Sequence, residues 1–139
     1  MRWYRELPHT SDALMEAYGR TLPEAFANAA RAMMSVMLDV RRVRGTLNGL
    51  CETGGTDMES LLYNWLECVL NEFQIGGRAF TRFHVDIDAR SFALSATMKG
   101  EHYDPSRHGM GRDVKAVTYH SMSIGRRGDL YYARFLLDL

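Results

Sequence analysis

Apolar residues recur at helical spacing in two segments of the chain. The first segment follows Thr21, and its apolar stripe consists of Leu22, Phe26, Ala29, Met33, Val36 and Met37. The second follows Thr56, and its stripe consists of Leu62, Trp65, Leu66, Val69 and Phe73. In both segments the threonine precedes a glutamate by three positions (Glu24 and Glu59), which is the spacing of a capping box at a helix start. We therefore predict two helices, the second ending at the glycines of "IGG".

Elsewhere apolar and polar residues alternate, which is typical of strands. In residues 80–89, Phe83, Val85 and Ile87 share one face, and residues 92–98 continue this pattern after a turn. Further strands are predicted at 2–7, 12–19, 46–53 (the weakest), 114–124 and 129–139. Because strands occur in blocks, we expect an α+β fold, a two-layer sandwich in which one largely antiparallel sheet carries both helices on one face. No linker or repeat divides residues 1–139, so we expect a single domain.

Composition narrows the setting of this fold. The chain has 17 basic and 17 acidic residues and is 46% hydrophobic. Zero net charge argues against an extended nucleic-acid surface, although a local basic patch is compatible with it. No apolar stretch approaches the roughly 18 residues of a membrane span, and the start of the chain has no signal-peptide core. We expect a cytoplasmic protein without a membrane partner.

Cysteine and methionine give no sign of a soft-metal site. Cys51 and Cys68 occur in ordinary contexts without a CxxC motif, so we expect two reduced thiols, with Cys68 in a helix core. Met33, Met34 and Met37 lie on a predicted helix, where filling the core is the expected role.

The last strand carries an acidic residue beside the terminal carboxylate. Phe135, Leu137 and Leu139 share its apolar face, and Asp138 lies next to Leu139. Two neighbouring anions each favour a proton or a cation, and calcium or magnesium prefers such oxygens. Alternatively, Asp138 is simply solvated or pairs with Arg134. A further acid, Asp12, precedes the strand at 12–19 and could join Asp138 only if these two strands are sheet neighbours.

A polar loop between residues 100 and 115 is the third unusual stretch. It contains the charged side chains Asp104, Arg107, His108, Arg112 and Lys115. Loops of this length without regular structure are often functional, but solvated charges explain the composition equally well. The chain has no phosphate-binding glycine motif and no recognisable Ser/His/Asp or Cys/His set.

Several motifs in this order resemble the archease family along nearly the whole chain. They are "HTSDALMEAYGRTLPEAF", "SLLYNWLECVL", "HGMGRDVKAVTYH" and the terminal "LLDL". The resemblance implies an accessory protein rather than an enzyme, one that assists the RNA-splicing ligase. That ligase joins 2′,3′-cyclic phosphate or 3′-phosphate ends to 5′-hydroxyl ends after GTP guanylylates one of its histidines. RNA would then be contacted only indirectly, through the ligase.

The resemblance also implies a divalent cation, usually calcium, held by Asp12, Asp138 and the carboxylate of Leu139. We further expect Arg107, His108 and Lys115 to face the ligase. The chain departs from the family where acidic residues are frequent, because Asn64 and Cys68 replace two of them. A general chaperone or an accessory of an RNA-modification enzyme is the alternative function. A small metal-dependent hydrolase lacks a recognisable nucleophile or base pair.

Overall fold

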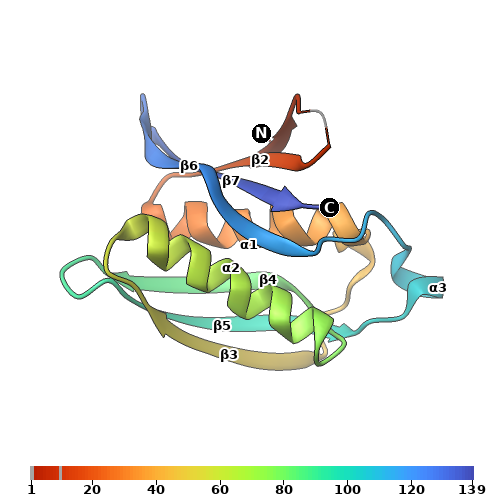
Figure 1. Cartoon of the computed structure of the whole chain (residues 1–139). Coiled ribbons are helices and arrows are strands. Elements are labelled where there is room, and N and C mark those ends of the chain that lie inside the picture. Colours follow the sequence, from red (N-terminus) through yellow and green to blue (C-terminus); the bar gives the residue numbers. More distant parts are fainter. Residues whose placement is uncertain (1, 10) are drawn as a thin grey trace.

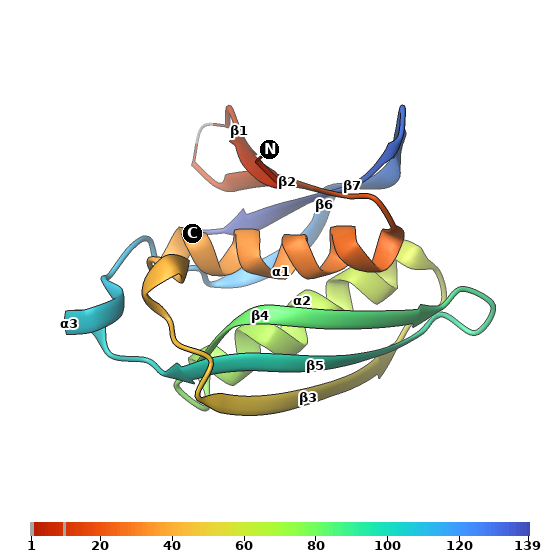
Figure 2. The ribbon, with the colours of Figure 1, turned by 180° about the vertical axis from the view of Figure 1, so that it is seen from behind.

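Two antiparallel sheets enclose two long helices in this protein (Figures 1 and 2). The computed structural model describes residues 2–9 and 11–139. The first sheet has the strand order β1 (Tyr4–Leu7), β2 (Ala13–Gly19), β7 (Leu130–Asp138), β6 (Ala116–Arg127). The second has the order β3 (Leu47–Gly54), β5 (Ala93–His102), β4 (Arg78–Asp88). The helical elements are α1 (Leu22–Met37), η1 (Val40–Arg42), α2 (Met58–Gln74) and α3 (Pro105–His108).

The α+β class, the antiparallel pairing and the two long helices are confirmed, whereas the single sheet is wrong. The strands form two sheets, and the helices lie between them rather than on one outer face. Helix α1 packs on β2 and β7 from one side and on β4 from the other, and α2 packs on β6 and on β3 and β4. The alternation of apolar and polar residues shows which residues share a face of a strand, but it does not show which strands are neighbours. The number of sheets therefore could not be predicted from it.

Burial of α1 on two sides follows from its composition. The expected stripe is buried except for the partly buried Leu22, and Ala25, Ala30, Ala32 and Met34 are buried on the remaining sides. A helix that is apolar nearly all round is suited to a position between two layers. The indole N–H of Trp65 on α2 donates to the carbonyl of Phe26 at 2.9 Å and joins the two helices inside the core.

The helix starts agree with the capping pattern at one helix and differ by one residue at the other. Thr21 caps α1, and its hydroxyl accepts from the backbone N–H of Glu24. At α2 the capping residue is Asp57 instead of Thr56, and its carboxylate accepts from the N–H of Ser60 at 2.8 Å. The Ser60 hydroxyl completes this capping box. No helix in the described ranges is long and apolar enough to cross a membrane.

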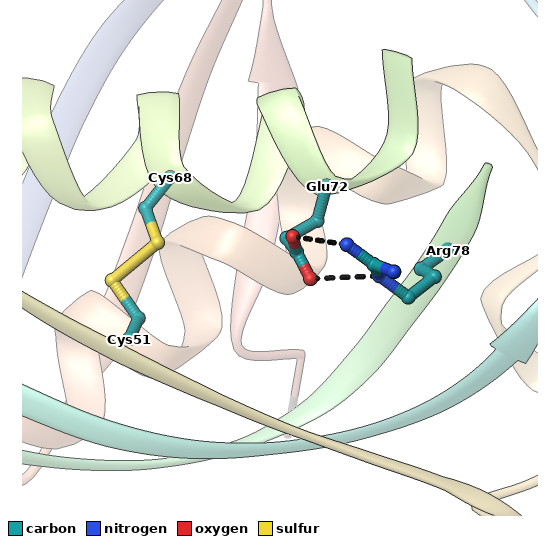
Figure 3. Close-up of a disulfide and its surroundings, with 4 residues drawn as sticks. All are labelled: Cys51, Cys68, Glu72 and Arg78. Carbon is teal, nitrogen blue, oxygen red and sulfur yellow. Dashed lines mark hydrogen bonds and ion pairs between the residues drawn. A yellow bond between two sulfur atoms is a disulfide. The ribbon is translucent and has the colours of Figure 1, made fainter. Parts of the chain in front are cut away.

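The two cysteines form a disulfide between β3 and α2 (Figure 3), so the expectation of two reduced thiols is wrong. Their Cα atoms are 6.7 Å apart, within the range a disulfide can bridge. Spacing in the sequence does not reveal this, because β3 and α2 become neighbours only through the fold. Closing a loop of this size corresponds to about 3 kcal/mol in the chain-entropy description. One turn further along α2, Glu72 forms an ion pair with Arg78 at 2.8 Å.

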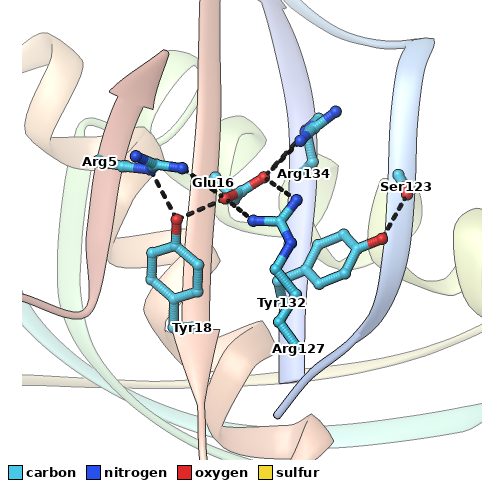
Figure 4. A network of polar contacts seen from close by, with 7 residues as sticks. All are labelled: Arg5, Glu16, Tyr18, Ser123, Arg127, Tyr132 and Arg134. Carbon is cyan, nitrogen blue, oxygen red and sulfur yellow. Dashed lines mark hydrogen bonds and ion pairs between the residues drawn. The ribbon is translucent and has the colours of Figure 1, made fainter. Parts of the chain in front are cut away.

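A carboxylate with three arginine partners joins the four strands of the first sheet (Figure 4). Glu16 on β2 is fully buried. It accepts from Arg127 of β6 at 2.6 Å and from Arg134 of β7 at 2.8 Å, and Arg5 of β1 lies at 3.4 Å. The hydroxyl of Tyr18 donates to the same carboxylate. Burial raises the pKa of Glu16, but the hydrogen bonds from Arg127, Tyr18 and Arg134 outweigh it and lower the pKa to about 2.

This depressed pKa predicts a pH dependence of stability. Because the ordinary value is 4.5, the ionised network stabilises the folded state fully above that pH. This contribution is lost as the pH falls from about 5 towards 2. Replacing Glu16→Gln should lower the free energy of unfolding at pH 7 by about 3 kcal/mol or more, because three arginines lose their counter-charge. Urea unfolding at several pH values measures this, and the deficit of the variant should shrink as the pH falls.

The exposed Glu52 supplies a matched control. Replacing Glu52→Gln should change stability at pH 7 by no more than about 0.5 kcal/mol. A deficit for Glu16→Gln that stays constant from pH 7 to pH 2 would contradict the assigned role of its charge.

Candidate functional site

The pairing of β2 with β7 brings the two predicted acidic ligands to one edge of the first sheet. These strands are antiparallel neighbours, and Ala13 is paired with Leu137. Asp12 and Asp138 are the residues that follow this pair, so extending the register by one step would set them beside each other. Side chains alternate along a strand, so both aspartates belong to the face that carries Glu16 rather than to the face buried against α1. The sequence left open whether these two strands are neighbours in a sheet, and they are.

Apolar neighbours hold this edge in place. Ala13 and Leu137 are fully buried, and Leu136 on the opposite face is 3% exposed. Asp12 and Leu139 are half-buried, and Asp138 is exposed. Like charges directly opposite on neighbouring strands repel each other, and a cation between them removes that repulsion.

The donor atoms at this edge suit a hard cation. Carboxylate oxygens are preferred by calcium and magnesium, and two of them belong to adjacent strand ends. Within residues 2–9 and 11–139, no three His, Cys, Asp or Glu side chains gather as a metal site. These four residue types therefore do not supply a third ligand, and the carboxylate of Leu139, the residue after Asp138, is the expected third one. Solvent would fill the remaining positions.

Lys115 lies beside the same edge. Its backbone N–H donates to the carbonyl of Asp138 at 2.7 Å, just before β6 begins. The amide of Gln74, the last residue of α2, donates to the carbonyl of Val114 at 2.7 Å. Val114 is fully buried, whereas the Lys115 side chain is exposed. The backbone of Lys115 is thus fixed from both sides, and its ammonium remains free to reach outward.

The loop between β5 and β6 is organised around a buried carboxylate. It contains the one-turn helix α3, where no regular structure was predicted. Glu101, 9% exposed, accepts from the backbone N–H of Arg44 at 2.7 Å and from the guanidinium of Arg107 at 3.0 Å. The Nε2 atom of His108 lies 3.0 Å from the same oxygen. The N–H of Arg44, followed by His108, lowers the pKa of Glu101 to about 2.

His108 was predicted to face a partner, and this prediction is wrong for its side chain. The imidazole is fully buried, and its Nδ1 accepts from the backbone N–H of Asp104 at 3.1 Å. That bond leaves Nε2 as the protonated nitrogen that donates to Glu101. His108 therefore shapes the loop from inside. Arg107 is exposed, as a partner contact requires, although it also pairs with Glu101.

The end of the loop is attached to α1 and β1. The N–H groups of Gly111 and Arg112 donate to the carbonyls of Met37 and Val36 at the end of α1. A side chain at position 111 would collide with those carbonyls, so glycine is required there. Arg112 forms an ion pair with Glu6 of β1 at 2.6 Å. These bonds fix the loop just before Lys115.

A cavity of about 700 Å³ lies on the other side of this loop. Its lining includes Arg2, Tyr4, Arg31 and Met110. The predicted site residues Asp12, Asp138 and Lys115 do not line it. The chemistry of the carboxylate edge is therefore separate from the cavity.

Comparison with known proteins agrees with this architecture. The model of the archease protein family matches residues 4–139. The chain belongs to this family. The family identified from the sequence motifs is thereby confirmed.

Relatives and solved structures match over the full length. The chain is 37% identical over 139 residues to the protein archease of Sulfurisphaera tokodaii, covering 100% of both proteins. It is 38% identical to that of Pyrococcus furiosus, covering 93% of this chain and 92% of the relative. The solution structure of Methanobacterium thermoautotrophicum protein 1598 superposes with a TM-score of 0.85 at 36% identity, with 100% of both chains covered.

The crystal structure of a Thermotoga maritima archease, described as a possible chaperone, has the same fold. Its TM-score is 0.67 at 19% identity, and the match covers 100% of this chain and 98% of that one.

Glu16 and Glu101 were missed as organising residues. Glu16 stands in a predicted strand and Glu101 at the start of the predicted polar loop, and both look like ordinary solvent-facing acids in the sequence. Important partners, Arg127 and Arg134 for Glu16 and the backbone N–H of Arg44 for Glu101, come from segments far away along the chain. Only the folded structure shows that these acids are buried.

The carboxylate edge leads to a prediction about calcium. If Asp12 and Asp138 hold the cation, calcium at 100 times its Kd should add about 2.7 kcal/mol to the stability of the folded state. The melting temperature should then rise by roughly 5–10 °C in a calorimetric scan. The double variant Asp12→Asn/Asp138→Asn should lose this shift, and one residue added after Leu139 should weaken it.

The matched control is Asp86→Asn/Asp88→Asn, which removes two exposed carboxylates from β4. This variant should keep the full calcium shift. An undiminished shift in the Asp12/Asp138 double variant would rule out the assigned ligands.

Proposed function

We propose that this protein is a non-enzymatic, metal-binding accessory protein that activates the RNA-splicing ligase in the cytoplasm. It promotes guanylylation of the ligase by GTP, and with it repeated joining of 2′,3′-cyclic phosphate or 3′-phosphate RNA ends to 5′-hydroxyl ends. The observation that carries the proposal is the β2–β7 register, which sets Asp12 beside Asp138 with Lys115 attached at the same edge.

In this proposal Asp12, Asp138 and the Leu139 carboxylate hold one divalent cation, with calcium the expected ion. When bound, the cation supplies a fixed positive charge at the rim of the sheet. Asp12 and Asp138 keep that charge on the face of the first sheet opposite α1. Lys115 adds an ammonium group from the neighbouring strand, and its stem can pack while the charge reaches outward. Arg107 extends the basic surface from the loop.

Activation without chemistry of its own requires that the protein favour one conformation of the ligase or complete its active site. We favour presentation of the cation to the ligase over a purely structural role. The fold has an extensive core of fully buried side chains, among them Trp65, Phe26, Phe80 and Phe135. A domain of this size with such a core does not depend on a metal to fold.

A general chaperone, the description given to the Thermotoga maritima archease, is a weaker candidate here. Binding of many unfolded clients calls for a contiguous apolar surface. Within the described ranges, the large exposed apolar side chains are Leu50, Ile75, Met110 and Tyr119, which stand on four different segments.

The test is guanylylation of the cognate ligase with labelled GTP, with this protein at limiting concentration. Wild-type protein should raise the yield of guanylylated ligase. Asp138→Asn should fold and still bind the ligase in a calorimetric titration but fail to promote guanylylation. Lys115→Ala should reduce the stimulation severalfold while its melting temperature and calcium shift remain unchanged.

The chain has one other lysine, Lys99, which is exposed on β5 and serves as the matched control. Lys99→Ala should stimulate the ligase as well as wild type does. Equal stimulation by Lys115→Ala would remove Lys115 from the partner surface. If Asp138→Asn unfolds and loses ligase binding as well, the cation has a structural role.

A further inference from the structure

The hairpin formed by β6 and β7 carries arginines stacked on tyrosines. The guanidinium of Arg126 lies 5.0 Å from the ring centre of Tyr131, and that of Arg127 lies 4.3 Å from the ring centre of Tyr132. Arg126 and Arg127 are exposed. The hairpin projects away from the body of the protein in both views (Figures 1 and 2). Because side chains alternate along a strand, the Arg127–Tyr132 pair lies on the face of the first sheet that carries Glu16, and the Arg126–Tyr131 pair lies on the opposite face of the same hairpin. Each pair presents a flat, positively charged surface to solvent on its own face.

Positive charge is in excess where this hairpin joins the sheet. Arg5, Arg127 and Arg134 surround one carboxylate, that of Glu16 (Figure 4). One negative charge thus faces three positive charges. Each guanidinium has five N–H groups, and Glu16 uses only some of them. The remaining donors are available to further anions.

Zero net charge of the chain does not cancel this local excess. The acid nearest to Arg5 in sequence, Glu6, is already paired with Arg112. Other carboxylates, such as those of Glu52, Asp86 and Asp88, lie on the second sheet, on the far side of the helices. The β6–β7 turn adds one acid, Asp129, to the three arginines Arg126, Arg127 and Arg134, so the hairpin end of the first sheet carries a local basic patch.

We propose that the β6–β7 hairpin and the adjoining face of the first sheet bind single-stranded RNA directly. Arg127 and Arg134 contact phosphates on the face that carries Glu16, and Arg126 contacts a phosphate where the RNA passes around the projecting hairpin to its other face. Bases stack on the arginine–tyrosine pairs. This inference rests on the proposed function, which supplies an RNA near the protein. It goes beyond that function, in which RNA is contacted only through the ligase.

Stacked guanidinium and aromatic planes favour RNA over an acidic protein segment as the occupant. Unpaired bases stack on aromatic rings and on guanidinium planes, and phosphates accept from the same arginines. An acidic peptide would use the charges but not the flat surfaces.

The proposed RNA face and the carboxylate edge are two ends of the same sheet surface. Asp12 and Tyr18 lie on one face of β2, six residues apart, which corresponds to roughly 20 Å along a strand. RNA on the arginine end would therefore run on the side of the protein that carries the cation and Lys115.

The experiment is a fluorescence-anisotropy titration of a labelled ten-nucleotide single-stranded RNA with this protein, without ligase, at several salt concentrations. We expect micromolar binding that weakens with salt, because phosphate contacts release counterions. Arg126→Ala should weaken binding roughly 3- to 10-fold and reduce the salt slope by about 0.7, the value for one phosphate contact in a single strand. Arg126→Lys should keep the slope but weaken binding, because the planar group is lost.

Arg126 lies outside the Glu16 network, so its replacement should not alter the melting temperature. Arg90→Ala, in the exposed turn between β4 and β5, is the matched control and should bind RNA like wild type. Absence of RNA binding, or binding unaffected by Arg126→Ala, would overturn the proposal. So would an acidic peptide that binds more tightly than RNA and depends on Arg126. Because no ligase is present, these results are independent of whether the protein activates guanylylation.

Discussion

Antiparallel pairing between β2 and β7 is the interaction on which the rest of this structure depends. One strand comes from the start of the chain and the other from its end, and the central pair of the first sheet is formed by them. Its register sets Glu16 opposite Arg134 and continues to Asp12 beside Asp138. A shift of one residue would turn Ala13, Met15 and Ala17 away from α1 and move every polar group to the wrong face. The apolar inner face therefore fixes the position of the polar groups on the outer face.

Two kinds of polar site follow from this one register. At the start of β2, Asp12 and Asp138 are acids that are not paired with a basic residue across the strands. A bound cation would supply their counter-charge. Four residues along, the single carboxylate of Glu16 is surrounded by three arginines, which leaves positive charge in excess. The β5–β6 loop adds Lys115 to the acidic end, because Glu101, the end of α1 and Gln74 hold the loop in place. The fold thus separates the proposed cation site from the proposed RNA-binding hairpin along the strands of the first sheet.

The sequence predicted the elements well, because local patterns determine them. Both helices, the strand positions and the Thr21 cap follow from periodicity and capping chemistry, and the family follows from motifs of specific residues. The features that it did not predict depend on which distant segments meet. Examples are the division into two sheets, the Cys51–Cys68 disulfide and the burial of His108, which looks like a loop residue until Glu101 is placed beside it. At α2 the pattern predicted Thr56 as the cap, and the cap is instead the next residue, Asp57, with which Ser60 completes the capping box. The Asp12–Asp138 pair lies between these cases, because the sequence marks both residues as candidate ligands, whereas their proximity depends on the strand order.

Crystals of the protein grown with manganese in place of calcium provide the most direct test of the central claim. Manganese is a hard cation with the same preference for oxygen ligands, and its anomalous scattering locates it without reference to the protein coordinates. The account predicts one strong anomalous peak within about 2.5 Å of the carboxylate oxygens of Asp12 and Asp138, with the Leu139 carboxylate in the same coordination sphere. A map with no peak at this edge, or with its strongest peak at other residues, would contradict the account.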